Sequence, residues 1–135
     1  MPGRSLRAAL LIPLIALCVS CGAFAVGRDD LIGDFQADYG FGVEALRLAR
    51  DGHYDQLFRE EGEDTWTSNS GQWEFKGGAI PALLLHDSLR VQDGGVSRPA
   101  YREPVPGIRT FQIRKGWRTI EIVEEGGGPS FRKVQ

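Results

Sequence analysis

Cysteine is scarce in this chain of 135 residues, and both copies, Cys18 and Cys21, lie near the N-terminus. No cysteine follows Cys21, so the rest of the chain has neither a disulfide nor a thiol nucleophile. Small exported domains that cannot build a sufficient core usually rely on disulfides. This domain must therefore depend on packing, for which a hydrophobic content of 41% is adequate.

The usual sequence signatures of enzymes are also missing. The chain has no G-x-S-x-G turn, and the glycines at 126–128 are not followed by the Lys-Ser/Thr of a phosphate-binding loop. No pair of carboxylates is set among apolar residues that would raise a pKa for acid–base work. We predict a protein that is not an enzyme and needs no cofactor, with a hydrolase that uses unidentified carboxylates as an alternative.

Long apolar runs are limited to one stretch, residues 8–20, which is too short to span a bilayer comfortably. Arg4 and Arg7 precede it and small residues follow it, which is the composition of an export signal. Removing these two arginines from the 16 basic residues leaves 14 against 18 acidic ones, a net charge of −4. A domain with this charge has no electrostatic basis for binding nucleic acid.

The end of the signal decides how the protein is attached. Residues 17–22, Leu-Cys-Val-Ser-Cys-Gly, resemble a bacterial lipobox, which implies cleavage before Cys21 and acyl groups on its thiol. Because Gly22 rather than Asp follows, the resemblance implies the outer membrane, with the domain facing the periplasm. The alternatives are cleavage after Ala25, which would release a soluble periplasmic or secreted domain, and an uncleaved anchor. The C-x-x-C spacing of Cys18 and Cys21 does not indicate a redox motif, because it lies within the signal.

The strongest signal after the leader is a β-hairpin around Asp51-Gly52. Apolar residues alternate with polar ones over residues 44–50 and again over residues 53–59, where Tyr54, Gln56 and Phe58 share one face. Asp-Gly tolerates the positive φ that a tight hairpin turn requires. Two half-buried antiparallel strands are therefore expected here.

Further turn signals recur near residues 71, 77, 94, 107, 116 and 127, and no convincing helix follows the signal peptide. A second hairpin is expected from 109–114 and 117–123. These spacings predict an all-β domain of eight to nine short strands, a small antiparallel meander barrel or sandwich. We divide the chain into a signal peptide (1–20), a tether (21–30) and a β domain (31–135).

The pieces Gly33-Asp34-Phe35, the Asp-Gly hairpin, Gly71-Gln72-Trp73 and a closing basic-aromatic strand resemble the lipocalin-like, or calycin, domains of small bacterial envelope lipoproteins. The resemblance covers most of residues 31–134. It implies a meander barrel more than it implies a ligand, since lipocalins carry Gly-x-Trp on their first strand, where this chain has Phe35.

Several residues on expected loops are candidates for a binding site. Large aromatic residues outside strands are available for a barrel mouth or a protein contact, and arginines in the proline-rich segment could face an anion. The candidates are Tyr39, Phe41, Trp66, Arg98, Tyr101 and Arg102. The partner predicted is a protein or a small apolar ligand, held at one end of the barrel.

A metal site is the alternative from another class. His53 and His86 are the two histidines of the chain, with Asp55 and Asp87 near them, and two His plus a carboxylate hold zinc or copper if the fold brings them together. In that case the domain would be a periplasmic metal-binding or stress-sensing module. The acidic residues 60–64 lack the register of a calcium loop and are expected to form a solvated loop.

Overall fold

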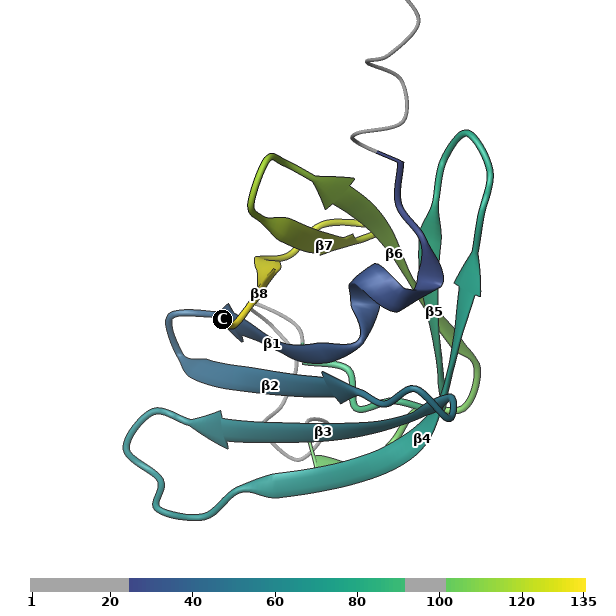
Figure 1. Ribbon diagram of the computed structural model, residues 1–135. Coiled ribbons are helices and arrows are strands. Elements are labelled where there is room, and N and C mark those ends of the chain that lie inside the picture. The colour runs from purple at the N-terminus through teal and green to yellow at the C-terminus, as the bar shows by residue number, and fades with distance from the viewer. Residues whose placement is uncertain (1–24, 92–101) are drawn as a thin grey trace, which may run out of the picture.

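The computed structural model describes residues 25–91 and 102–135, and within them the chain forms a closed antiparallel barrel. Its elements are η1 (Arg28–Leu31), β1 (Gly33–Asp38), β2 (Gly42–Leu48), β3 (His53–Glu60), β4 (Thr67–Lys76), β5 (Ala82–His86), β6 (Ile108–Lys115), β7 (Ile120–Glu124) and β8 (Ser130–Lys133). Each strand pairs with the next, and β8 pairs with β1 (Figure 1). The all-β prediction is confirmed, and of its two forms the barrel is the one adopted.

Closure of the barrel removes the exposed edges that an open sheet would have. The closing pairs are Phe35 with Lys133 and Gln36 with Arg132. Residues 88–91 make one isolated bridge, between Leu89 and Pro104, and the described residues contain eight strands. Cys21, Arg98 and Tyr101 lie outside the described residues.

The Asp51-Gly52 hairpin forms as predicted, joining β2 to β3. Gly52 has a φ of +92°, and the Asp51 Oδ1 accepts a hydrogen bond of 3.0 Å from the backbone N–H of His53. On β3, Tyr54 and Phe58 face inward, as the alternation indicates. The same inward phase includes two polar residues, Gln56, which is fully buried, and Glu60, which ends the strand and is 9% exposed.

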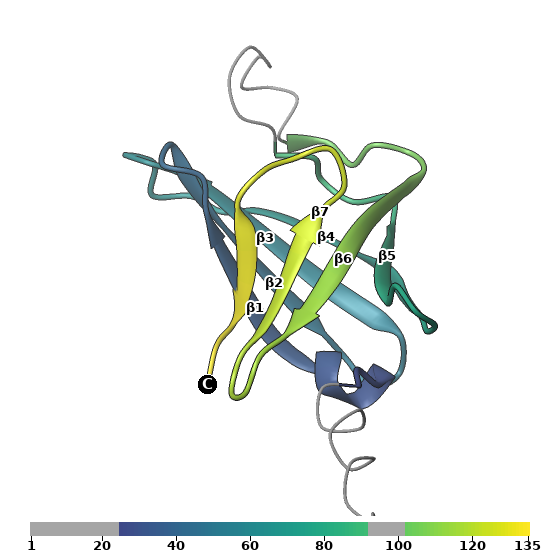
Figure 2. The same cartoon turned by 90° about the horizontal axis from the view of Figure 1, so that it is seen from above.

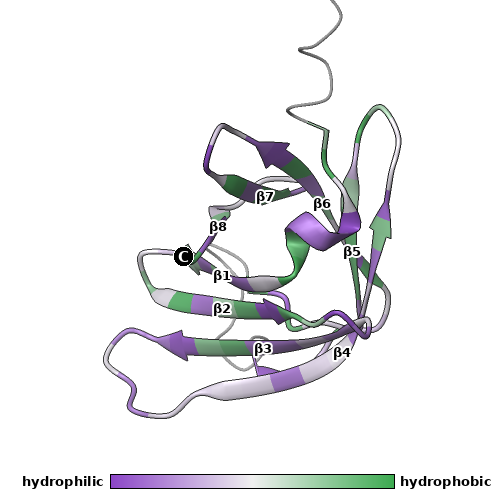
Figure 3. Ribbon diagram, in the orientation of Figure 1, coloured by the Kyte–Doolittle hydropathy of each residue, from purple (hydrophilic) through white to green (hydrophobic). Residues whose placement is uncertain are grey.

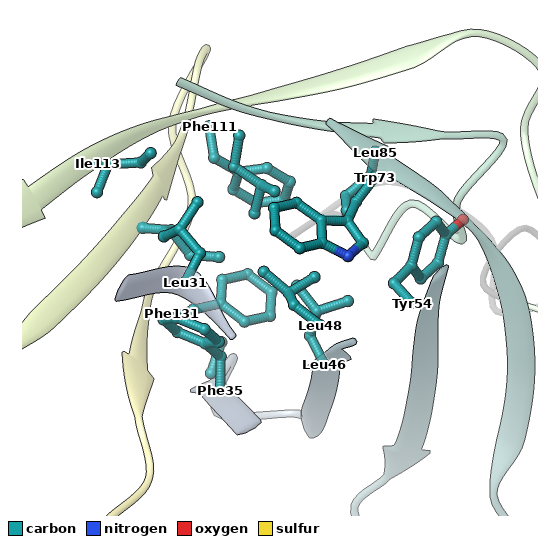
Figure 4. Packing of buried hydrophobic residues seen from close by; sticks show 13 residues of the cluster. Leu31, Phe35, Leu46, Leu48, Tyr54, Trp73, Leu85, Phe111, Ile113 and Phe131 are labelled. Carbon is teal, nitrogen blue, oxygen red and sulfur yellow. The ribbon is translucent and has the colours of Figure 1, made fainter. Parts of the chain in front are cut away.

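The barrel interior is filled by side chains. Its main cluster combines aromatic and aliphatic residues, and every strand contributes at least one of them (Figure 4). It comprises Leu31, Phe35, Ala37, Leu46, Leu48, Tyr54, Trp73, Leu83, Leu85, Phe111, Ile113, Ile122 and Phe131. The alternating hydropathy along β2 and β3 in Figure 3 reflects this inward and outward division. Dense packing of this kind replaces the disulfides that the chain lacks.

The 3-10 turn η1 closes one end of the barrel, although residues 21–30 were expected to form a tether. Leu31 is completely buried in the core, and Val26 packs against it. The Asp30 carboxylate accepts from the Gly27 N–H at 2.8 Å and from Lys115 Nζ at 3.2 Å, and these contacts hold its pKa below the ordinary value. The packed body therefore begins about five residues earlier than the sequence indicated.

The two ends of the barrel are formed by different parts of the chain (Figure 2). The N-terminal end contains residues 25–32, 49–52, 76–81, 115–119 and 133–135. The distal end contains residues 38–42, 60–66, 87–91, 102–108 and 124–129. This division follows from the up-and-down order of the strands, and these two names are used below.

Two local predictions were wrong. Trp117 was expected to begin a strand and face inward, but β7 starts at Ile120 and Trp117 is 82% exposed in the β6–β7 turn. Gly71 was expected in a turn, but it lies inside β4, opposite Tyr54. A Cβ at Gly71 would lie 2.6 Å from the Tyr54 hydroxyl, so glycine is required there by close approach.

Gly71→Ala is expected to destabilise the protein by about 1–3 kcal/mol, because the added methyl group overpacks the core. Tyr54 has no room to yield, since its hydroxyl donates to the His86 carbonyl at 2.6 Å. Chemical denaturation of the purified protein measures the loss. Gly77→Ala is the matched control, because its nearest contact is 3.6 Å and a change of less than about 0.5 kcal/mol is expected. Equal losses would contradict the argument.

Candidate functional site at the distal end

Four of the six candidate binding residues, Tyr39, Phe41, Trp66 and Arg102, lie at the distal end. They come from three separate connections, between β1 and β2, between β3 and β4, and before β6. The strand order brings these connections together because each joins strands at the same end of the barrel. That these residues bind a ligand stays a prediction.

Tyr39 and Phe41 form a cover over the barrel rather than an open mouth. Their ring centroids are 5.6 Å apart, and each lies within 6.4 Å of Phe58. Phe58 and Val91 are buried beneath them, at 3% and 2% exposure. Edge-to-face aromatic contacts of this kind stabilise packing beyond the area they bury. The distal end is thus closed by an aromatic lid made of these four residues.

Beneath the aromatic lid lies a buried ionic network centred on Arg109. Its Nη1 donates to Glu44 Oε1 at 2.9 Å and to the Leu89 carbonyl at 3.1 Å, and its Nη2 donates to Glu124 Oε2 at 2.9 Å. Arg109 and Glu44 are 2% and 0% exposed. β6 contributes the guanidinium, β2 and β7 contribute the carboxylates, and the network therefore ties three strands together.

Gln56 extends the network toward the segment after β5. Its Nε2 donates to Glu44 Oε1 at 2.6 Å and to the Leu89 carbonyl at 2.9 Å. Its Oε1 accepts from the Leu89 N–H at 2.8 Å. The side chain of Gln56 thus supplies the hydrogen bonds that a neighbouring strand would otherwise make to Leu89, which lies in irregular backbone. These hydrogen bonds hold the backbone of Leu89 in place.

The electrostatics of the network favour a fixed arrangement of protons. Burial, followed by the charge of Glu44, raises the pKa of Tyr39, whose hydroxyl donates to Glu44 Oε2 at 2.6 Å. Burial alone would lower the pKa of Arg109, but the charge of Glu44 and the bond to Glu124 together raise it. Tyr39 thus stays a neutral donor and Arg109 stays a cation. The network is suited to holding the fold and not to transferring protons.

The exposed rim around the lid is acidic. A hollow of about 470 Å³ is lined by Asp38, Glu60, Glu61, Glu63 and Asp64, with Arg59 beside them. Trp66 is 43% exposed, and the Arg59 guanidinium lies 4.7 Å from its ring centroid. Arg102 pairs with Glu63 at 2.9 Å across the two distal loops. Residues 61–64 lie in the β3–β4 loop as predicted, whereas Glu60 ends β3 and is 9% exposed, and together they line one side of the hollow.

The two histidines lie apart from this rim. His53 Nδ1 lies 3.2 Å from Asp51, and His86 Nε2 lies 3.0 Å from Glu74, so neither uses the aspartate suggested by the sequence. β4 separates the strands that carry them. Within residues 25–91 and 102–135, no group of three or more His, Cys, Asp or Glu side chains is placed to hold a metal ion.

Glu44 and Arg109 are absent from the candidates predicted from the sequence, and Gln56 was assigned only to a face of its strand, although a signal was present for all three. Each occupies the inward phase of its strand: Glu44 alternates with Leu46, and Arg109 alternates with Phe111. A polar residue in the apolar phase indicates either a strand end at the surface or a buried partner of opposite charge. The pairing of Glu44 with Arg109, 65 residues later, depends on barrel closure and has no local signature.

A second hollow, of about 510 Å³, lies on the outside of β1–β4 and was also missed. Its lining includes the outward-facing Ala45, Leu57 and Ser68, beside the ion pair of Asp34 with Arg47. Residues on this face alternate as ordinary solvent-facing residues do. The hollow depends on how side chains from several strands lie beside one another, which no local sequence pattern contains.

Comparison of the chain with protein-family models, with curated proteins and with solved structures found no match. The lipocalin-like resemblance thus rests on the short motifs and on the barrel itself. Among the described residues, no helix has both the length and the apolar character needed to cross a membrane.

Arg109→Met is expected to cost about 3–5 kcal/mol of folding stability, because it leaves Glu44 buried without its cationic partner. Thermal or urea unfolding measures the loss. Arg132→Met is the matched control, since Arg132 also pairs with a glutamate across strands, at 3.1 Å, but its side chain is 79% exposed. The control should change stability by less than about 1 kcal/mol. A cost for Arg109→Met no larger than the control's would show that the network does not hold the barrel.

Proposed function

We propose that this protein is a non-enzymatic envelope protein, held to the outer membrane by acyl groups on Cys21, that binds a partner protein at the distal end. The partner presents a basic surface to the acidic rim. Trp66 supplies the apolar contact within that surface. Three features support this role: the filled barrel, the acidic charge of the rim and the position of Ala25 at the N-terminal end.

The filled interior favours a protein partner over a small apolar ligand. Ligand-binding barrels of eight strands keep part of the lumen open, whereas here the inward residues of all strands pack on one another. The aromatic lid and the Arg109 network occupy the remaining distal part. A small apolar molecule would have to displace these contacts to enter.

The single observation that carries the proposal is the acidic hollow beside Trp66. The distal end contains nine acidic and two basic residues among those described. Lysine or arginine side chains of a partner would find several carboxylates in the 470 Å³ hollow. An exposed tryptophan next to such a hollow is typical of the residues that dominate binding energy at protein interfaces.

The position of Ala25 indicates which end of the barrel would face the membrane and which end would face a partner. The first described residue, Ala25, lies at the N-terminal end, where its carbonyl accepts from Lys115. A membrane anchor at Cys21 would therefore hold the N-terminal end toward the membrane and turn the distal end toward the periplasm. The metal-binding alternative gains no support, because each histidine pairs with a separate carboxylate.

Cys21→Ala is expected to release the protein from the membrane fraction and to abolish incorporation of labelled fatty acid, because the acyl chains supply the attachment. Fractionation of cells and radiolabelling measure both. Cys18→Ala is the matched control and should leave both unchanged, since it lies in the removed leader. Labelling that persists in Cys21→Ala, or membrane release in Cys18→Ala, would refute lipidation at Cys21.

A photo-crosslinking residue in place of Trp66 should yield one discrete adduct in intact cells. The same residue in place of Leu57, which is 39% exposed on the barrel side, is the matched control and should yield none. Reversing charge with Glu61→Lys and Asp64→Lys should reduce the Trp66 adduct at least about tenfold, because like charges across an interface cost several kcal/mol. An adduct that survives the reversal, or that forms equally at Leu57, would refute the proposed interface.

A further inference from the structure

The two most exposed large hydrophobic side chains among the described residues both lie at the N-terminal end. Trp117 is 82% exposed and Ile80 is 72% exposed. Trp117 occupies the turn between β6 and β7, and Ile80 occupies the turn between β4 and β5. Figure 1 shows both hairpins at the end of the barrel where the coiled turn η1 lies. Single exposed apolar residues are ordinary, but two on neighbouring tips require an explanation.

The charge of this end is opposite to that of the distal end. The N-terminal end contains six basic residues, Arg28, Arg50, Lys76, Lys115, Arg118 and Lys133, against three acidic ones. Arg118 follows Trp117 in the β6–β7 turn, Lys76 ends β4 four positions before Ile80, and both basic side chains are exposed. Since the whole mature chain is acidic, this basic end is a local feature of the fold and not a consequence of composition.

The chain outside the described residues limits where this end can lie. Cys21 and Ala25 are four positions apart in the sequence, a distance of at most about 14 Å when the chain is fully extended. Lys115 Nζ, at the end of β6 beside the β6–β7 turn, donates to the Ala25 carbonyl at 3.3 Å. An anchor at Cys21 would therefore turn the N-terminal end, which carries both hairpin turns, toward the lipid surface.

Trp, Ile and basic residues together have the composition of a surface that rests in a membrane interface. Tryptophan prefers the headgroup level, where its ring is partly apolar and its N–H is solvated. Exposed lysines and arginines beside it are attracted to anionic phospholipid. A protein partner at this end would have to share the narrow space that the short tether leaves.

We propose that the N-terminal end docks on a bilayer containing anionic phospholipid, with Trp117 and Ile80 inserted at the interface and Lys76 and Arg118 against the headgroups. This inference rests on the proposed lipid anchor and deepens it. The anchor supplies attachment, and the docked tips fix the orientation of the barrel, so that the acidic rim faces away from the membrane.

The test uses the full lipidated chain in vesicles that contain phosphatidylglycerol and a brominated phospholipid, which quenches tryptophans in contact with the bilayer. The chain has three tryptophans, of which Trp73 is buried and Trp66 is at the distal end. We expect quenching for the natural chain. The quenching should be lost in Trp117→Phe and should remain in Trp66→Phe. Quenching unchanged in Trp117→Phe would overturn the proposal.

Two further comparisons separate insertion from simple proximity. Ile80→Gln should at least halve the quenching, whereas Ile108→Gln, at a 51% exposed position of the distal end, should not change it. Replacing phosphatidylglycerol with a zwitterionic lipid should reduce the quenching, since headgroup attraction is lost. Quenching insensitive to Ile80→Gln and to lipid charge would overturn docking.

Sedimentation of the same vesicles reports the anchor independently. Protein that sediments without quenching of Trp117 has an anchor but is not docked, which refutes this inference alone. Protein that fails to sediment refutes the anchor, and with it the docked orientation proposed for the anchored chain.

Discussion

The structure depends on the pairing of Arg109 with Glu44 and Glu124 inside the distal end of the barrel. Burying these charges is expensive, and hydrophobic residues of similar volume could fill the same space at no loss of stability. What the charges add is geometry, because they are satisfied only when β2, β6 and β7 meet in one register. In this protein the network also holds Gln56 and Leu89 in place. It therefore helps to close the distal end of the barrel, where the acidic rim lies.

The barrel has two chemically different ends, and this asymmetry links the fold to the proposed roles. The N-terminal end is basic with exposed apolar tips, and the distal end is acidic with an aromatic lid. Because the strands run alternately up and down, consecutive turns fall at opposite ends. Charges that appear mixed along the sequence are therefore sorted into two separate surfaces.

Much of the strand pattern could be predicted from the sequence, because alternation and turn chemistry are local. Residues 53–60 and the Asp51-Gly52 turn formed as expected. The prediction for Trp117 was wrong because an aromatic residue after Lys-Gly resembles the start of a strand. The turn extends to Thr119, whose carbonyl accepts a hydrogen bond from the Gly116 N–H at 2.8 Å. The prediction of a turn at Gly71 was wrong because, in the sequence, a glycine required by a close cross-strand contact with Tyr54 cannot be distinguished from a turn glycine.

The sequence by itself determined the strand content and the absence of cysteine after Cys21, and export is a prediction that it makes. These properties depend on residue type and on spacing over a few positions. Only the tertiary structure decided that the barrel closes and fills, that Glu44 and Arg109 meet inside, and that Trp117 and Ile80 share one end. Such contacts join residues tens of positions apart, and strand order and register, which no local pattern contains, decide which of them form.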